Sequence, residues 1–195
     1  MGISEATSLA QPRRKDRAVH DEEWVGDFLR RAAYGYLATV QDGQPFLNMN
    51  IFVYDEARHA IYLHTARTGR TRTNVEADGR VCFGVSSMGR LLPASTALEF
   101  SVEYAGVTVF GRASVVTDGA EAEGALQRLL DKYAPHLRPG RDYRATTAEE
   151  LARTTVFRID IEQWGGKQKV APADFPGAFL YGTVPAGTGD AKKGA

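Results

Sequence analysis

The 195-residue chain has little cysteine and no long apolar run. Its single cysteine, Cys82, excludes both an internal disulfide and a multi-cysteine zinc site. Cys82 lies in the apolar run Val-Cys-Phe, which indicates a small buried hydrophobe rather than a reactive thiol. No window approaches the roughly 18 apolar residues of a membrane span, and no apolar segment follows the basic N-terminal residues as in a signal peptide. We therefore expect a cytoplasmic protein that makes no membrane contact.

The sequence also lacks an excess of charge of either sign. Lys plus Arg and Asp plus Glu number 24 each, so no global field favours nucleic acid or an anionic membrane surface as a partner. The four histidines are scattered without a His-Glu-x-x-His pattern, and no metal site is predicted. No Gly-x-Ser-x-Gly elbow indicates a serine hydrolase. The function has to be sought in local polar clusters.

The two ends of the chain differ in composition from its middle. Residues 1–18 are small, polar and basic, and residues 183–195 are mostly Gly, Ala and Lys, so we expect both segments to be disordered tails. The length and the 43% hydrophobic content fit one globular domain, which is predicted to occupy residues 19–182.

The hydrophobic pattern changes from helical to extended near residue 34. Asp21 can cap a helix whose apolar residues share one stripe: Trp24, Val25, Phe28, Leu29 and Ala32. Strands are predicted over residues 34–40 and 45–55, joined by a turn at Asp42-Gly43, and over 60–65, 80–87, 99–117 and 154–164. A short helix entered at Thr68-Gly69, a helix over 121–134 and an irregular loop over 88–98 lie between them. This pattern predicts a mainly β fold, a small antiparallel barrel with flanking helices.

The segment TARTGRTRTN, residues 65–74, places three arginines and four threonines between two apolar runs. The first turn of a helix offers unpaired backbone N–H groups and a partial positive charge, so the segment is a candidate phosphate site. The alternative is a solvated surface loop whose arginines face water. Threonine and arginine alone do not specify a ligand.

Three further features bear on the site. Asn48 and Asn50 project from the same face of a predicted strand, where unpaired burial costs about 1–3 kcal/mol each, so a polar group is expected to meet them. His64 directly precedes the candidate phosphate segment, but without a cofactor a structural histidine is the better interpretation. WGGKQKV (164–170) lacks the first glycine of a Walker loop and has Gln168 at its Ser/Thr position, so it is not a nucleoside triphosphate site.

Four segments, in this order, carry a resemblance: GYLATVQDGQPFLNMNIFVYD, IYLHTARTGRTRTNVEADGRVCFGV, YAGVTVFGRASVV and FRIDIEQWGGKQK. Together they resemble the pyridoxamine 5′-phosphate oxidase-like split-barrel flavoproteins, and within these the Nim-type branch, the nitroimidazole-resistance or flavin-nucleotide-binding proteins. The resemblance covers about residues 20–182. It implies a six-stranded antiparallel split β-barrel with flanking α-helices, and a homodimer with FMN at the subunit interface.

The resemblance also implies site residues. A strand with Asn48, Met49, Asn50 and Ile51 would run beside the flavin ring, and His64 and Thr65 would lie near the flavin. A loop would hold the phosphate with Thr68, Gly69, Arg70, Thr71 and Asn74. A C-terminal pair, Trp164 and Lys167, would reach the flavin from the partner subunit. Many relatives have Lys where this chain has Thr71. The missing ammonium removes about 1.5–3 kcal/mol of charge-assisted phosphate binding unless Arg67 or Arg72 substitutes for it.

The function implied by the resemblance is that of an FMN-dependent oxidoreductase that reduces small electron-poor organic substrates, such as nitro compounds or quinones. His64 is the candidate catalytic side chain, and the 88–98 loop is a candidate wall of the substrate pocket. Three alternatives stay open: a deazaflavin-dependent reductase on the same fold, a non-catalytic flavin- or haem-binding module, and a dimerising protein with an empty pocket.

Overall fold

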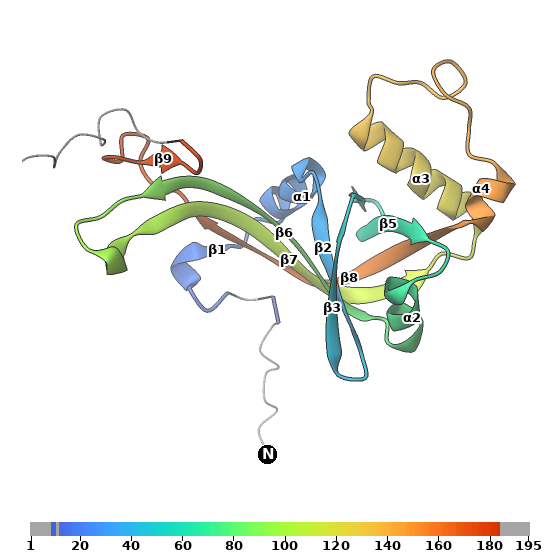
Figure 1. Cartoon of the computed structure of the whole chain (residues 1–195), viewed down its shortest axis with the longest axis horizontal. Coiled ribbons are helices and arrows are strands. Elements are labelled where there is room, and N and C mark those ends of the chain that lie inside the picture. The colour runs from blue at the N-terminus through green and yellow to red at the C-terminus, as the bar shows by residue number, and fades with distance from the viewer. Residues whose placement is uncertain (1–8, 11, 184–195) are drawn as a thin grey trace, which may run out of the picture.

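The structure is a computed structural model that describes residues 9, 10 and 12–183 (Figure 1). Of the expected tails 1–18 and 183–195, residues 1–8, 11 and 184–195 lie outside the described residues. The strands are β1 (Ala18–Val19), β2 (Gly35–Gln41), β3 (Gln44–Asn50), β4 (Phe52–Asp55), β5 (Ala60–Ala66), β6 (Arg80–Leu92), β7 (Ser101–Val115), β8 (Thr154–Lys169) and β9 (Phe179–Leu180). The helices are α1 (Glu22–Arg31), α2 (Arg70–Ala77), α3 (Gly119–Tyr133) and α4 (Ala148–Ala152), with 3-10 turns η1 (Lys15–Arg17) and η2 (Ala97–Glu99).

One antiparallel sheet forms the body of the protein, in the order β3-β2-β6-β7-β8-β5-β4, with β1 added to β8 and β9 added to β6. Its two end strands, β3 and β4, follow each other in the chain and are separated by Ile51 alone. The sheet therefore curls back on itself, and a covalent link replaces the hydrogen bonds that would close a complete barrel. This is a split barrel, and the predicted mainly β fold class is confirmed.

The strand predicted over residues 45–55 is divided in two. β3 pairs with β2 through a tight turn in which Asp42 and Gly43 have positive φ, as the Asp-Gly signal predicts. β4 instead pairs with β5, Phe52 lying opposite Leu63. The alternating pattern continues across Ile51 because both halves have one buried face, so the change of partner leaves no mark in the sequence.

Two predicted strands continue much further than expected. β6 extends through Leu92, into the segment predicted to be a loop, and β8 extends from Thr154 to Lys169 instead of ending at residue 164. With β7 they form a long arm to one side of the barrel (Figure 1). Beyond the barrel the two faces of the arm are similarly exposed, so its residues show no hydrophobic alternation, and cross-strand pairing rather than local pattern keeps them extended.

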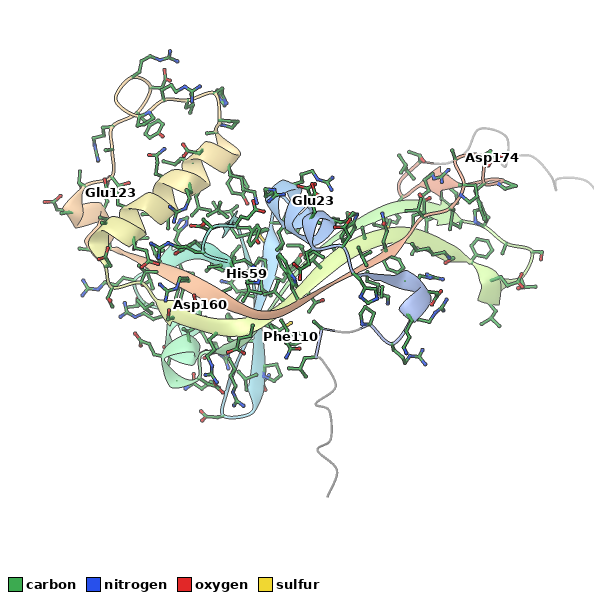
Figure 2. All side chains as sticks on the ribbon, turned by 180° about the vertical axis from the view of Figure 1, so that it is seen from behind. Glu23, His59, Phe110, Glu123, Asp160 and Asp174 are labelled. Atoms are coloured by element: carbon green, nitrogen blue, oxygen red, sulfur yellow. The ribbon has the colours of Figure 1, made fainter. Side chains whose placement is uncertain are left out.

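The helices cover the barrel on the sides that the apolar stripes predict. α1 begins at its N-cap Asp21, whose carboxylate accepts hydrogen bonds from two first-turn N–H groups, and it buries Val25 and Leu29 in the main core. A second, smaller cluster lies between α3 and strands β5 and β8, around Tyr62 and Ala125. At the exposed turn between β4 and β5, His59, which Figure 2 labels, packs edge-on against Trp164, with ring centroids 4.5 Å apart.

The C-terminal end of α3 holds the split in the barrel. The Tyr133 hydroxyl accepts a hydrogen bond from the Phe52 N–H at 3.1 Å and lies 3.1 Å from the Phe52 carbonyl oxygen. The Lys132 ammonium donates to the same carbonyl at 3.0 Å and lies 3.9 Å from the Phe52 ring centroid. Side chains of α3 thus take the place of a neighbouring strand at the first residue after Ile51.

Part of the expected N-terminal tail is ordered against the sheet. β1 pairs with the end of β8, Ala18 opposite Lys167 and Val19 opposite Gly166. Ala10 is buried, and a Cβ on Gly165 would lie 2.3 Å from its carbonyl oxygen, so glycine is required where the segment crosses β8. The structure thus differs from the boundary predicted at residue 19. In the described part of the chain, no helix is long and apolar enough to cross a bilayer.

Candidate functional site

The N-terminus of α2 is an open cradle of backbone donors. Its N-cap is Gly69, which offers no capping side chain, and within the described residues the N–H groups of Arg70, Thr71 and Arg72 have no hydrogen-bond acceptor. Gly69 has a φ of 151°, and a Cβ there would meet nothing within 4 Å. Unpaired donors, the positive end of the helix dipole and free space together fit a phosphate group.

The three arginines of the segment have different surroundings. Arg72 is engaged with Glu76 at 2.7 Å and donates to the Arg67 carbonyl at 3.1 Å. Arg67 donates to the carbonyl of Ala152, and Arg70 lies over the Phe46 ring at 5.3 Å. Among the described residues no carboxylate pairs with Arg67 or Arg70, so these two cations remain available to an anion.

The predicted asparagines meet the start of α2. The Asn48 amide donates to the Asn50 carboxamide oxygen at 3.3 Å and to the Thr71 hydroxyl at 3.4 Å, and Asn50 and Thr71 are both buried. Met49 and Ile51 are exposed, Met49 on the opposite face of β3. The strand therefore divides the four predicted residues: the asparagines support the cradle, while Met49 and Ile51 form an apolar surface.

His64 and Thr65 lie on opposite faces of β5. His64 shares its face with Tyr62 and the small core beneath α3, and its Nδ1 atom is buried without a partner among the described residues. Burial lowers the pKa of His64, so the imidazole is neutral at pH 7. Thr65 lies opposite Thr155, and its hydroxyl donates to the Ala66 carbonyl. Only one of the two side chains can face a given ligand surface.

Asn74 and Thr68 have contrasting positions. The Asn74 side chain is fully buried, donating to the Thr39 hydroxyl at 2.8 Å, so it anchors α2 to β2 and does not reach the open cradle. Thr68 is exposed directly before Gly69. The sequence reasoning missed Phe46 beneath Arg70, although its alternation with Asn48 could have revealed it. It also missed Thr155, which donates to the Arg67 carbonyl and which only strand pairing brings there.

Trp164 and Lys167 lie far from the cradle of the same chain. Thr155 touches the cradle through its contact with Arg72, and Lys167 is twelve residues further along β8. At about 3.3 Å per residue, that separation is roughly 40 Å along the strand. A single chain therefore does not bring the predicted C-terminal pair to the predicted phosphate residues. In the described residues no group of three or more His, Cys, Asp and Glu side chains is placed to hold a metal ion.

The split barrel and the unpaired N–H groups at the N-terminus of α2 place this chain in a class of proteins. These are small antiparallel barrel proteins suited to a phosphate-bearing ligand. A family model described as "Pyridoxamine 5'-phosphate oxidase" matches residues 21–168. The chain belongs to this family. Among curated proteins no match is found.

Solved structures share the fold. The flavocytochrome Anf3 from Azotobacter vinelandii superposes with a TM-score of 0.73 at 22% identity, covering 94% of this chain and 92% of its own. An FAD and heme binding protein from Mycobacterium smegmatis gives 0.69 at 25% identity, covering 80% and 74%. A candidate 5-nitroimidazole antibiotic resistance protein from Bacteroides thetaiotaomicron gives 0.65 at 16% identity, covering 77% and 86%.

Proposed function

We propose that the chain binds a flavin, FMN being the form that the family resemblance implies, and acts as an oxidoreductase on small electron-poor organic acceptors. The observation that carries the proposal is the uncapped start of α2, where three N–H groups have no acceptor and Arg67 and Arg70 have no carboxylate partner among the described residues. Family membership and the flavin named for the Mycobacterium smegmatis relative support it. A bound flavin supplies the redox chemistry itself.

The residues of the chain then hold and orient the cofactor. The first turn of α2 with Arg70 binds the phosphate, and Asn48 fixes the Thr71 hydroxyl beside it. Met49 and Ile51 offer an apolar surface to the flat ring. Of the two β5 residues predicted near the flavin, Thr65 shares its face with Thr155, which contacts the cradle, whereas His64 lies on the α3 face and is held neutral because burial lowers its pKa.

The active protein in this proposal is a homodimer. Trp164 and Lys167 can approach a cofactor at α2 only if that cofactor belongs to a second copy, because roughly 30 and 40 Å of β8, respectively, separate them from Thr155 at their own cradle. Exposed apolar side chains on β2 and β3 supply a surface for the contact: Tyr36, Leu47 and Met49. The partner would thus complete the site.

Haem is a second candidate ligand, favoured by the heme named for the 25% identical relative. The absorption spectrum of the purified full-length chain, before and after addition of FMN or FAD and a desalting step, distinguishes the candidates. Flavin bands that stay with the protein and bleach on reduction support the proposal. A Soret band instead indicates haem. A spectrum that neither flavin changes contradicts the proposal and makes a deazaflavin the next cofactor to test.

A substitution tests the position of the cradle. Arg70→Ala should raise the flavin Kd by about tenfold to a hundredfold, because a charge-assisted hydrogen bond contributes about 1.5–3 kcal/mol. The matched control is Arg58→Ala, which removes an exposed arginine whose ion pair with Glu121 spans 3.6 Å. Fluorescence titration of both variants, each first checked for a native circular dichroism spectrum, measures the effect. Equal Kd values for the two variants would rule out the phosphate assignment.

A further inference from the structure

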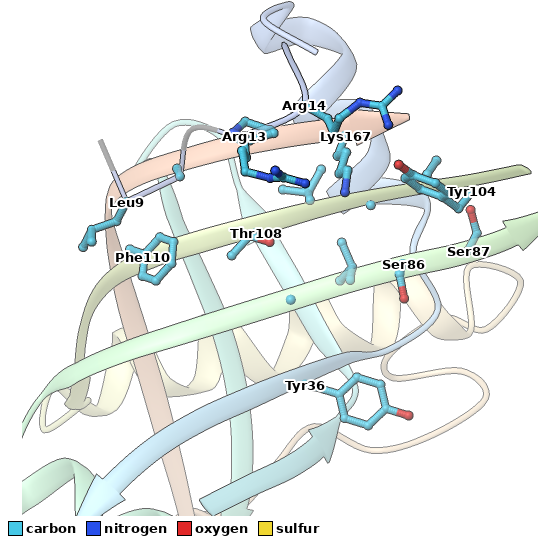
Figure 3. Close-up of a pocket in the computed structure, with 18 of the residues that line it drawn as sticks. Leu9, Arg13, Arg14, Tyr36, Ser86, Ser87, Tyr104, Thr108, Phe110 and Lys167 are labelled. Atoms are coloured by element: carbon cyan, nitrogen blue, oxygen red, sulfur yellow. The ribbon is translucent and has the colours of Figure 1, made fainter. Parts of the chain in front are cut away.

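The lysines that the structure describes have different surroundings. Lys15 is exposed in the turn η1. Lys167 and Lys169 lie at the end of β8, where the exposed Lys167 side chain extends over the outer face of the sheet (Figure 3). Lys132 lies instead at the split of the barrel, between α1, α3 and β4, and its partners differ in kind from those of a surface lysine.

The Lys132 ammonium bridges two elements through backbone carbonyls. It donates to the Phe52 carbonyl of β4 at 3.0 Å and to the Leu29 carbonyl of α1 at 3.4 Å. It also lies 3.9 Å from the centroid of the Phe52 ring. All of these partners are uncharged, so the fold holds the nitrogen in place without neutralising its charge.

No carboxylate of the described residues pairs with Lys132. Asp131, next to it in the chain, accepts a hydrogen bond from the Gln127 amide at 2.8 Å instead. Burial lowers the pKa of Lys132 from 10.5 to about 8, so much more of its amine is unprotonated near neutral pH than in an ordinary lysine. The unprotonated amine is the nucleophilic form of lysine.

The same carbonyls suit an acylated lysine. Acylation leaves a neutral amide with one N–H, which can donate to the Phe52 carbonyl as the ammonium does. It removes a charge whose desolvation is only partly compensated, and it gives up only the longer contact with Leu29. Ile51, beside Phe52 in the chain, and Tyr133, beside Lys132, are 44% and 37% exposed, so the site lies next to the protein surface.

We propose that Lys132, held by the Phe52 and Leu29 carbonyls, is a modification site that takes a small acyl group from an acyl phosphate. Such a donor is activated enough to react with a free amine directly and small enough to reach a partly buried nitrogen. The nitrogen forms a bond to the acyl carbon, the carbon–oxygen bond to phosphate breaks, phosphate leaves with the electron pair, and the amine loses one proton to water. The reaction needs neither a flavin nor a second copy, so it stands apart from the proposed function.

Acetyl phosphate is the probe that tests the proposal. The purified full-length protein is incubated with it at a pH of about 8, and mass spectrometry of proteolytic peptides at successive times gives the acetylation rate of each lysine. Lys132 should react at least about tenfold faster than the exposed Lys15, because a larger fraction of its amine is unprotonated. In concentrated urea the two rates should become equal, because the preference depends on the folded surroundings.

Two matched variants assign the fast reaction. Lys132→Arg should remove it from the time course of the intact mass, and Lys15→Arg should retain it, each variant being first checked for a native circular dichroism spectrum. Equal rates for Lys132 and Lys15 in the native protein would overturn the proposal, because the carbonyls would then not favour the free amine. Acetylation of Lys132 that occurs only in urea would also overturn it, because the fold would then shield the nitrogen.

Discussion

Lys132 is a partly buried lysine at the split of the barrel. Its ammonium donates to the carbonyls of Leu29 and Phe52 and lies over the Phe52 ring, but no described carboxylate pairs with it. Burial lowers its pKa from 10.5 to about 8. The two carbonyl dipoles and the ring face thus compensate only part of the free-energy cost of removing the Lys132 ammonium from water.

The lowered pKa of Lys132 predicts a pH dependence of stability. Between pH 8 and 10.5 the unfolded chain binds more protons at this residue than the folded chain, so its contribution to the free energy of unfolding rises with pH. Lys132→Met should remove the rise. Urea unfolding of both proteins at pH about 7 and about 10 measures it, the difference between wild type and variant being the informative quantity. An unchanged difference would show that Lys132 titrates normally.

The comparison is made as a difference because other buried groups also titrate at alkaline pH. Burial raises the pKa values of Cys82 and Tyr133, so each favours the folded state less as pH rises above its ordinary pKa. Both residues are present in wild type and in Lys132→Met. The opposite sign of the Lys132 contribution makes it distinguishable from theirs.

Among the elements, β7 and β8 decide the shape of the sheet. Their register shifts between Phe110 and Gly111, the position at which the pair passes from the barrel into the arm. A Cβ at Gly111 would lie 2.1 Å from the carbonyl oxygen of Asp160, a backbone atom that cannot move aside. The bulge and the close approach together require glycine.

Gly111→Ala should therefore lower the free energy of unfolding by about 3 kcal/mol or more, at or above the upper end of ordinary overpacking. Gly84→Ala is the matched control, since Gly84 is a strand residue of β6 whose Cβ would meet nothing within 4 Å. It should change the free energy of unfolding little. Chemical denaturation of the two variants measures both effects. Similar stabilities would mean that the bulge accommodates the added methyl group without loss of stability.

At the scale of the whole molecule, the split in the barrel leaves an apolar surface beside it. Leu47 and Met49 on β3, and Ile51 at the split itself, are 62%, 55% and 44% exposed. Apolar side chains gathered at one place on a surface mark interaction sites. In the proposed homodimer, a second copy packed on this surface would bring the α2 cradle of one chain close to Trp164 and Lys167 of the other.

The proposed homodimer predicts a mass in solution of twice the 21.3 kDa of the chain. Met49→Asp should convert it to the monomer, because a buried unpaired carboxylate is costly at an interface. Leu137→Asp, in the α3–α4 loop, is the control and should leave the dimer intact. Light scattering after size-exclusion chromatography measures the mass. A wild-type monomer at every concentration would contradict the proposed dimer.

The candidate site was predictable from the sequence where its parts are local. The helix start at Gly69 and the alternation of Asn48 with Asn50 depend on a few neighbouring residues, and the structure brings both to one place. The burial of Asn74 and the proximity of Thr155 were not predictable, because each depends on which strand lies beneath α2. The predicted roles of these residues toward a flavin stay predictions.

The sequence by itself determined the elements near the barrel, since each has one buried face and therefore a readable period. Asp21 as a helix cap and the Asp42-Gly43 turn are examples. Only the tertiary structure decided the split at Ile51, the long arm of β6 to β8 and the crossing of Ala10 over Gly165. The physical reason is the same in each case: strand pairing and chain crossing over glycine act between residues far apart in sequence, and they leave no periodic signal where both faces are exposed.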